Sequence, residues 1–177
     1  MDPSKVSAVM RWPSPSTLKG IHGSLGLTGY CRRFIKDYGK IAAPLTALLK
    51  KAEPAPPRRA WSWPAEADKA YHDLKRALTT TPLLRTPDFS KEFVVECDAS
   101  GRGLSAVLMQ NRLPVAYFSK TLSSCWLAIL AYEKEHMALV LAIQHWQPYL
   151  LGQRFVVYTD QRSLRQLLAH PLSTPAQ

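Results

Sequence analysis

The stretch Phe93-Val94-Val95-Glu96-Cys97-Asp98-Ala99-Ser100 decides the fold of this chain. A short run rich in Val and Phe that closes on small residues is typical of a buried central β-strand. Asp98 lies near the C-terminal end of that strand, where an unpaired buried carboxylate would cost several kcal/mol. Either a metal ion, a cation or hydrogen bonds hold its charge, or Asp98 has the ordinary structural role of a turn former or helix cap.

Length and composition indicate a globular protein with one domain, or one domain and a smaller appendage. The chain has 177 residues, of which 46% are apolar and 20% are charged. It contains no apolar run of ~18 residues. The first residues, Met1-Asp2-Pro3-Ser4, show no signal-peptide pattern, so we expect an intracellular protein, cytoplasmic or nuclear, without a membrane partner. Three cysteines without CxxC spacing argue against a disulfide or zinc framework.

The positive charge is concentrated in the first half of the chain. Residues 1–87 contain 15 Lys and Arg against 6 Asp and Glu, whereas residues 88–177 contain 8 against 7. The excess in the first half suits a polyanionic partner, although a solubilising surface explains it about equally well. Residues 30–36 interleave aromatic and basic side chains, a mixture that suits nucleic acid but also an ordinary amphipathic turn. The candidate nucleic-acid-binding residues are Arg32, Arg33, Lys36 and Lys40.

Helical periodicity predicts three short helices before residue 52, the third of them interrupted early by Pro44. Residues 53–64 are rich in proline, which is typical of a semi-rigid exposed linker. A further helix is expected over residues 65–78, followed by an extended connection. Its predicted buried stripe consists of Ala67, Ala70, Tyr71, Leu74 and Leu78.

The second half predicts an α/β (α+β) fold with a mixed sheet. After the strand of Asp98, residues 104–110 and 113–119 are expected to form two further strands, joined by a turn at Asn111-Arg112. These three strands are antiparallel. A crossover helix over residues 127–146, which Pro148 should shorten, leads to a fourth strand over residues 155–159 that is parallel to the first. A last helix is expected to begin at Ser163.

Glu135 and Asp160 are the candidate partners of Asp98. Asp160 ends a strand expected beside the first, and Glu135 is expected on the apolar stripe of the crossover helix. That stripe also contains Leu139, Ala142 and Ile143. Clusters of carboxylate oxygens suit Mg²⁺ or Mn²⁺, and two such ions ~3.5–4 Å apart can clamp the attacking and leaving oxygens of a phosphodiester. Alternatively, Asp160 is a helix cap and Glu135 interacts with the helix dipole.

Several short motifs, in this order and spacing along nearly the whole chain, identify a family. Those of the first half are Asp2-Pro3-Ser4-Lys5-Val6 with Trp12-Pro13, Leu25-Gly26-Leu27-Thr28-Gly29-Tyr30 with Arg32-Arg33-Phe34-Ile35, and Pro44-Leu45-Thr46. Those of the second half are Asp98-Ala99-Ser100, Ala116-Tyr117-Phe118-Ser119-Lys120, Tyr132-Glu133-Lys134-Glu135, Tyr149-Leu150-Leu151-Gly152 and Thr159-Asp160. With these motifs the chain resembles the polymerase-to-nuclease region of gypsy-type long-terminal-repeat retrotransposon polyproteins.

The resemblance implies a domain organisation. Residues 1–52 would be the helical, thumb-like segment of reverse transcriptase, followed by the linker at 53–64 and by a tether helix and connection at 65–87. Residues 88–177 would be an RNase H-like domain, truncated at its C-terminus. The polymerase palm and the integrase of the polyprotein would lie elsewhere: the chain contains no Tyr-x-Asp-Asp motif, so we expect no polymerase activity.

The resemblance also implies a function. Asp98, Glu135 and Asp160 would be catalytic, metal-binding carboxylates that hold Mg²⁺ or Mn²⁺, two ions in a complete site, and cut RNA paired to DNA. The thumb-like segment would grip the primer–template backbone. The partner would therefore be an RNA–DNA hybrid or another nucleic-acid duplex.

The chain also departs from the family pattern. The family's fourth nuclease carboxylate lies in a later helix, and this chain ends at Gln177 before reaching it. His136 replaces an apolar residue, and Gln161 replaces a residue that is commonly His. We therefore expect weak or no cleavage of hybrids by residues 1–177. The alternative is a non-catalytic retroelement remnant that folds in part and at most binds nucleic acid, through residues 1–59.

Overall fold

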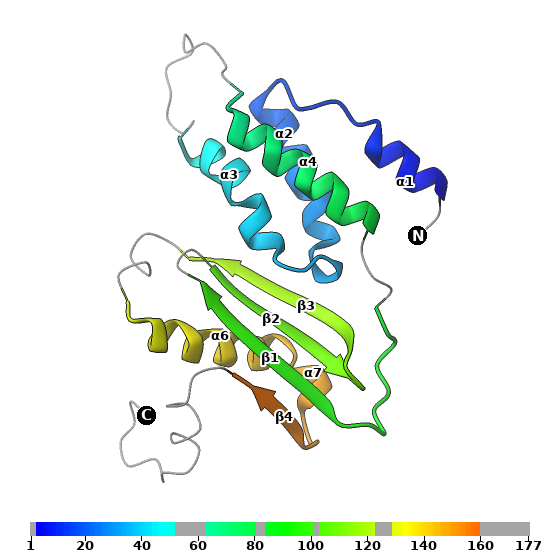
Figure 1. Cartoon of the computed structure of the whole chain (residues 1–177), viewed down its shortest axis with the longest axis vertical. Coiled ribbons are helices and arrows are strands. Elements are labelled where there is room, and N and C mark those ends of the chain that lie inside the picture. The colour runs from blue at the N-terminus through cyan, green and yellow to red at the C-terminus, as the bar shows by residue number, and fades with distance from the viewer. Residues whose placement is uncertain (1–2, 52–62, 81–83, 101–102, 123–128, 160–177) are drawn as a thin grey trace.

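A four-stranded mixed sheet, with the strand of Asp98 inside it, forms most of the second half of the molecule (Figure 1). The computed structural model describes residues 3–51, 63–80, 84–100, 103–122 and 129–159. The strands are β1 (Phe93–Ser100), β2 (Gly103–Gln110), β3 (Leu113–Thr121) and β4 (Phe155–Tyr158). Their order is β3-β2-β1-β4, with β1, β2 and β3 antiparallel and β4 parallel to β1. The predicted antiparallel strands and parallel fourth strand are confirmed.

The hairpin between β2 and β3 turns at Asn111 and Arg112, as predicted. Their φ angles are +52° and +62°, so both residues are in the left-handed conformation that a two-residue type I′ turn requires. Asn adopts this conformation readily, whereas for Arg it is uncommon. The turn therefore forms because the strands on either side favour pairing, with Arg112 following Asn111 into the required geometry.

A bulge interrupts β3 shortly after the turn. Leu108 pairs with Ala116, but Met109 pairs with Pro114, which leaves Val115 as an extra residue on β3. Proline has no N–H to donate to a neighbouring strand, and bulges are among the places where sheets tolerate it. The bulge thus accommodates Pro114 near the start of an edge strand.

One face of the sheet packs against helix α6 (Ala131–His145), which is followed by the short helix α7 (Gln147–Leu150). The predicted helix thus ends at His145, and Pro148 lies in the first turn of α7, which confirms the predicted shortening. Helix α6 begins at Ala131, after Leu130 in an extended conformation, which is later than the predicted start at residue 127; residues 127 and 128 themselves lie outside the described residues. Sheet and helices share one buried core, centred on Phe93, Val95, Cys97, Leu104, Leu108, Ala138, Ala142 and Trp146.

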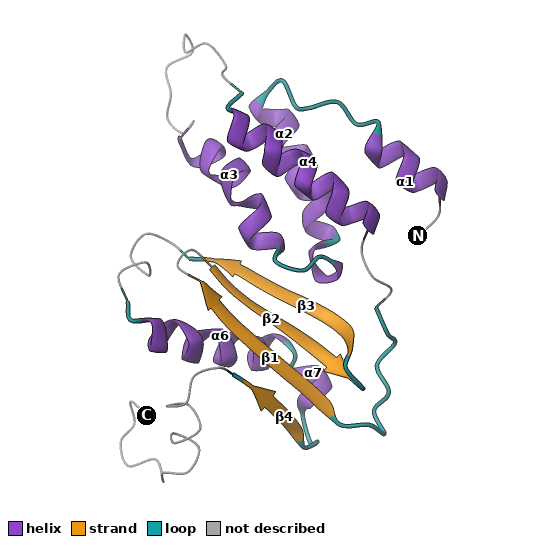
Figure 2. Ribbon diagram, viewed as in Figure 1, coloured by secondary structure: helices purple, strands orange, loops and turns teal. Residues whose placement is uncertain are grey.

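The first half of the chain forms a separate layer of helices (Figure 2). These are α1 (Pro3–Met10), α2 (Leu18–Tyr30), the 3₁₀ helix η1 (Arg32–Phe34), α3 (Tyr38–Lys51) and α4 (Ala65–Thr80). Thr17 caps α2, its Oγ1 accepting a hydrogen bond from Gly20 N at 3.1 Å. The predicted stripe of α4 is confirmed, because all five of its residues are buried. Within the described ranges, every helix is too short or too polar to cross a membrane.

Pro44 does not interrupt the third helix, so this part of the prediction is wrong. Helix α3 runs through Pro44 from Tyr38 to Lys51. The missing N–H of proline removes one hydrogen bond of the helix, at a cost of about 3 kcal/mol in a helix interior. Ala42 and Leu45, on either side of Pro44, are buried in the core of the helical layer, and their packing offsets this loss.

The helical layer contacts the sheet through η1 and the start of α3, which lie against β3 (Figure 1). The backbone N–H of Gly39 donates a hydrogen bond to Ser119 Oγ at 2.8 Å. A Cβ atom on Gly39 would lie 3.4 Å from that oxygen, an ordinary van der Waals distance, so the hydrogen bond and not the absence of a side chain defines this contact. Helix α4 packs in the helical layer, although the sequence places it in the tether. The domain boundaries at 52, 64 and 87 stay predictions, because most of the linker lies outside the described residues.

Gln110 fastens the connection that leads into β1. It is buried, and its Nε2 donates hydrogen bonds to the carbonyl oxygens of Asp88 (2.7 Å) and Lys91 (3.0 Å). Its Oε1 accepts a hydrogen bond from Asp88 N at 2.9 Å. One side chain at the end of β2 thus satisfies three backbone groups of the connection.

Gln110→Leu should destabilise the protein strongly although it conserves side-chain volume. Three backbone groups lose their partner, each at a cost of ~1–3 kcal/mol if it stays buried. Because water can reach part of this segment, we expect the free energy of unfolding to fall by about 2–4 kcal/mol, measured by urea denaturation. The control Gln144→Leu, at an exposed position of α6, should change it by less than about 0.5 kcal/mol. Equal stability of the two variants would contradict the role of Gln110.

Candidate metal centre and nucleic-acid interface

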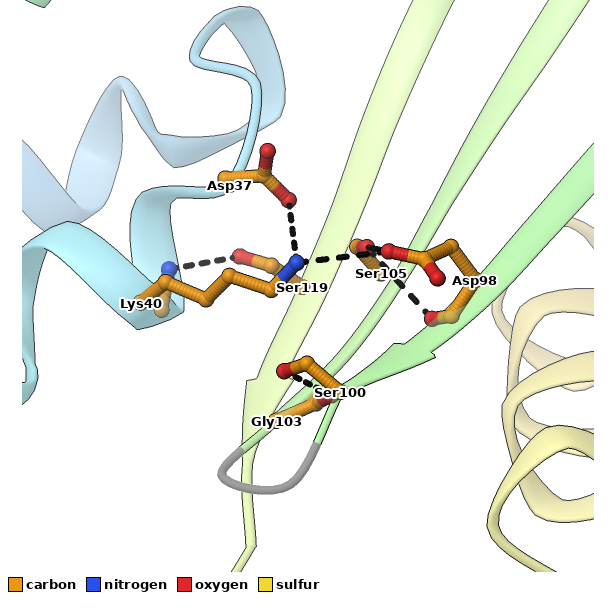
Figure 3. A network of polar contacts seen from close by, with 8 residues as sticks. Asp37, Lys40, Asp98, Ser100, Gly103, Ser105 and Ser119 are labelled. Carbon is orange, nitrogen blue, oxygen red and sulfur yellow. Dashed lines mark hydrogen bonds and ion pairs between the residues drawn. The ribbon is translucent and has the colours of Figure 1, made fainter. Parts of the chain in front are cut away.

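Asp98 projects from β1 on the face opposite α6, because Val95 and Cys97 take the alternate positions that face the core. Its side chain is 65% exposed. Lys40 Nζ, from the first turn of α3, lies 3.3 Å from Asp98 Oδ2, and Ser105 Oγ lies 3.5 Å from the same oxygen (Figure 3). A cation and a weak hydrogen bond therefore hold the charge of Asp98 in this structure, as two of the sequence alternatives anticipate.

Two clefts meet at Asp98. The first has a volume of about 250 Å³ and lies between the open face of the sheet and the turn that precedes α3. The second, of about 290 Å³, lies where β1 runs beside the end of β4. The first is lined by Lys36, Asp37, Glu96, Cys97, Asp98, Ser105, Ala106, Val107 and Tyr117, and the second by Glu96, Cys97, Asp98, Tyr158 and Thr159. A ligand in either cleft lies within reach of the Asp98 carboxylate.

Glu135 lies on α6 beside the buried positions of the helix. The predicted stripe is confirmed for Leu139, Ala142 and Ile143, which belong to the core of the sheet or pack against it. Lys134 and Ala138 are buried as well, although the predicted stripe does not include them. Glu135 is nevertheless partly buried, and its Oε2 is shielded from solvent.

The structure describes two of the three predicted carboxylates, Asp98 and Glu135. The hydrogen bonds and ion pair of Asp98 given above come from α3 and β2, whereas Glu135 belongs to the helix on the other face of the sheet. Asp160 lies outside the described residues; its neighbour Thr159 borders the second cleft together with Asp98. In the described part of the chain, no three His, Cys, Asp or Glu side chains form a group that could hold a metal ion. The convergence of Asp98, Glu135 and Asp160 stays a prediction.

The predicted nucleic-acid-binding segment forms an exposed surface. Arg32 and Arg33 lie in η1 and Lys36 follows it, all three exposed to solvent. The guanidinium carbon of Arg33 lies 4.9 Å from the centre of the Phe34 ring, a cation–π contact. Tyr30 at the end of α2 is 83% exposed. Cations and aromatic rings therefore face solvent side by side, as contacts with phosphates and bases require.

A cleft between η1 and β3 adds residues that the sequence analysis missed. It has a volume of about 250 Å³ and is lined by Arg32, Arg33, Tyr117, Phe118, Ser119, Lys120 and His145. Lys120 and His145 are the new members, and only the tertiary fold brings them to η1. Burial, and secondly the charge of Arg32, lower the pKa of His145, so its ring is neutral at pH 7. The positive charge of this cleft thus comes from the two arginines and Lys120.

Comparison with families and curated proteins gives consistent matches. A family model described as "RNase H-like domain found in reverse transcriptase" matches residues 63–157. The chain is 40% identical over 174 residues to the retrovirus-related Pol polyprotein from transposon 297 of Drosophila melanogaster, covering 98% of this chain and 16% of the relative. It is 32% identical over 166 residues to the transposon Tf2-3 polyprotein of Schizosaccharomyces pombe, covering 90% and 12%. The chain thus spans less than a fifth of the length of either relative.

Comparison with solved structures gives the same fold at lower identity. A foamy viral protease-reverse transcriptase in complex with RNA/DNA hybrid matches with a TM-score of 0.80 and 23% identity, covering 97% of this chain and 23% of that chain. The same kind of protein in complex with dsDNA matches with a TM-score of 0.81 and 24% identity, covering 97% and 36%. The match extends over both the helical layer and the sheet.

Asp98→Asn should leave stability almost unchanged. The substitution removes the ion pair with Lys40 and retains the shape of the side chain. Ion pairs this exposed contribute ~0–1 kcal/mol, so we expect the free energy of unfolding at pH 7 to change by less than about 1 kcal/mol. Urea denaturation measures this change. A loss of about 2 kcal/mol or more would assign Asp98 a structural role.

Asp88→Asn should change how the stability of the protein depends on pH. Hydrogen bonds from Lys91 and Ser90 hold the pKa of Asp88 well below its usual range. A lowered pKa contributes stability above the unfolded-state value of ~3.9, and this contribution is lost as the pH falls toward the folded-state value. We therefore expect the free energy of unfolding of the wild type to fall more than that of Asp88→Asn between pH 5 and pH 2, measured by urea denaturation at each pH.

Proposed function

Because this chain belongs to the family of RNase H-like domains found in reverse transcriptase, we propose that it is a divalent-metal nuclease for RNA paired to DNA. Asp98, Glu135 and Asp160 are the proposed metal ligands, and the helical layer is the proposed grip on the duplex. The observation that carries the proposal is the position of Asp98, an exposed carboxylate on the open face of β1 beside the end of β4.

The surroundings of Asp98 suit a hard divalent cation. The carboxylate and the hydroxyl of Ser105 offer oxygen atoms, which Mg²⁺ and Mn²⁺ prefer. The ammonium group of Lys40 already lies 3.3 Å from Asp98 Oδ2, so there is room for a cation at this oxygen. The neighbouring thiol does not compete, because burial raises the pKa of Cys97 to about 12 and keeps it protonated. When bound, the metal would activate water and stabilise the leaving oxygen of the phosphodiester.

The parallel pairing of β1 and β4 supports Asp160 as the second ligand. Glu96 is paired with Tyr158 in the register of these strands. Asp98 and Asp160 each follow two residues later along chains that run in the same direction, so we propose that their carboxylates are neighbours. Glu135, with its shielded Oε2 near the start of α6, is the proposed third ligand.

Duplex binding is assigned to the basic surface of the helical layer. Arg32, Arg33 and Lys36 are exposed cations, and the cleft at β3 adds Lys120. These side chains suit phosphates, which do not depend on base sequence. That two structural neighbours are complexes with RNA/DNA hybrid and with dsDNA supports a duplex as the ligand of this chain too.

A second candidate function is nucleic-acid binding without cleavage. Its support is the environment of Asp98, which is paired with Lys40 on one face of the sheet while Glu135 belongs to the helix on the other. In that case the basic surface would be the functional part, and Asp98 would join the helical layer to the sheet.

Cleavage of a labelled RNA–DNA hybrid in Mg²⁺ or Mn²⁺ separates the two functions. We expect weak metal-dependent cleavage of the RNA strand, and Asp98→Asn should lower it at least ~100-fold, because a lost ligand mispositions the reacting groups. Glu135→Gln and Asp160→Asn should have the same effect. The control Glu92→Gln removes an exposed carboxylate just before β1 and should retain cleavage. Binding of the hybrid without metal-dependent cleavage would favour the second function.

The salt dependence of hybrid binding tests the basic surface. Each phosphate contact releases counterions, which gives a slope of about −0.9 per contact in a plot of log K against log salt. Arg32→Gln with Arg33→Gln should reduce this slope by about 2 and lower affinity at 0.1 M salt by roughly tenfold or more, measured by fluorescence anisotropy. The control pair Lys69→Gln with Arg76→Gln removes two exposed cations of α4 and should change the slope by less than about 0.5. Equal slopes for both pairs would exclude η1 from the interface.

A further inference from the structure

Lys40 has a role of its own at the candidate metal centre. We propose that its ammonium group is the resident counter-ion of Asp98, and that a divalent ion binds Asp98 by displacing Lys40 to Asp37. Lys40 is then a positioning residue through which the helical layer controls metal binding on the sheet. This inference rests on the proposed function, because it takes Asp98 as a metal ligand.

The geometry makes the two cations exclusive. Lys40 Nζ lies 3.3 Å from Asp98 Oδ2, the same oxygen that Ser105 approaches (Figure 3). A magnesium ion binds a carboxylate oxygen at ~2.0–2.1 Å and brings its own water molecules. An ion on this oxygen would occupy the space of the ammonium group and repel its charge. Lys40 must therefore leave before Oδ2 binds a metal.

Asp37 provides the second position for Lys40. Lys40 Nζ already lies 3.5 Å from Asp37 Oδ1, one turn earlier on the chain. The ammonium group therefore stands between two carboxylates, one on the helical layer and one on the sheet (Figure 3). Moving away from Asp98 leaves the Asp37 pair in place, so the displaced lysine keeps a counter-ion.

The exchange needs a side-chain movement and no movement of the layers. The hydrogen bond from Gly39 N to Ser119 Oγ, at 2.8 Å, joins the residue before Lys40 to β3. The backbone of α3 therefore stays against the sheet while the flexible stem of Lys40 rotates.

Titration with Mn²⁺ in the absence of nucleic acid tests this inference by calorimetry. Lys40→Met should bind Mn²⁺ about two- to fivefold more tightly than the wild type, the range expected from losing an exposed ion pair. Lys50→Met removes the same charge from the same helix and should match the wild type. Lys40→Arg retains a cation and should also match it. Asp37→Asn leaves Lys40 with Asp98 alone and should weaken binding; Asn tolerates the φ of +56° at this position.

The outcomes separate this inference from the proposed function. If Asp98→Asn abolishes a Mn²⁺ site but Lys40→Met binds as Lys50→Met does, the role of Lys40 is wrong and the metal site stands. If Asp98→Asn binds Mn²⁺ like the wild type, the proposed metal site fails and this inference fails with it. Thermal unfolding of every variant verifies that affinities are compared between folded proteins.

Discussion

The parallel pairing of β4 with β1 is the constraint on which the candidate site depends. Helix α6 lies between the two strands in sequence and packs on one face of the sheet, so both strands run in the same direction. Side chains of β1 alternate between the two faces of the sheet, and this alternation determines the direction of Asp98. Because Val95 and Cys97 are committed to the core under α6, Asp98 must face the open side. Burial of Val95 and Cys97 on one face of β1 thus exposes the carboxylate of Asp98 on the other face.

The helical layer completes the surroundings of Asp98 from the open side. It reaches β3 through η1 and the start of α3, and from there Lys40 extends to β1. The long side chain of Lys40 makes the contact with Asp98, and the backbone of the preceding residue, Gly39, is hydrogen-bonded to β3. The side chain of Lys40 thereby links the helical layer to β1.

Much of the fold could be predicted because it follows local rules. A tight hairpin turn needs two residues in the left-handed conformation, which Asn adopts readily, so the turn at Asn111 was recognisable. The buried stripe of α4 has clear helical spacing. The burial of Lys134 and Ala138 on α6 is a tertiary effect that the spacing of large apolar residues does not indicate. The continuation of α3 through Pro44 depends on the burial of its neighbours Ala42 and Leu45, which is likewise a tertiary effect.

Part of the candidate site was also predictable, because it too follows local sequence patterns. The carboxylate at the end of a strand can be recognised from the neighbouring sequence alone, and so can the arginines of η1. Nothing in the sequence distinguishes Lys40 from Lys36, yet one is paired with a carboxylate 58 residues away and the other is exposed. The meeting of Arg32 with His145 across the edge of the sheet likewise requires the whole fold.

The contact of η1 and α3 with β3 has one more consequence. Edge strands offer unpaired backbone groups to other chains and are the usual starting points of aggregation. Here the bulge at Val115 distorts one part of the β3 edge, and the helical layer lies against another. The segment that carries the exposed Arg32 and Arg33 therefore also covers part of this edge. Separated from its helices, this sheet would be expected to associate with itself before it met any ligand.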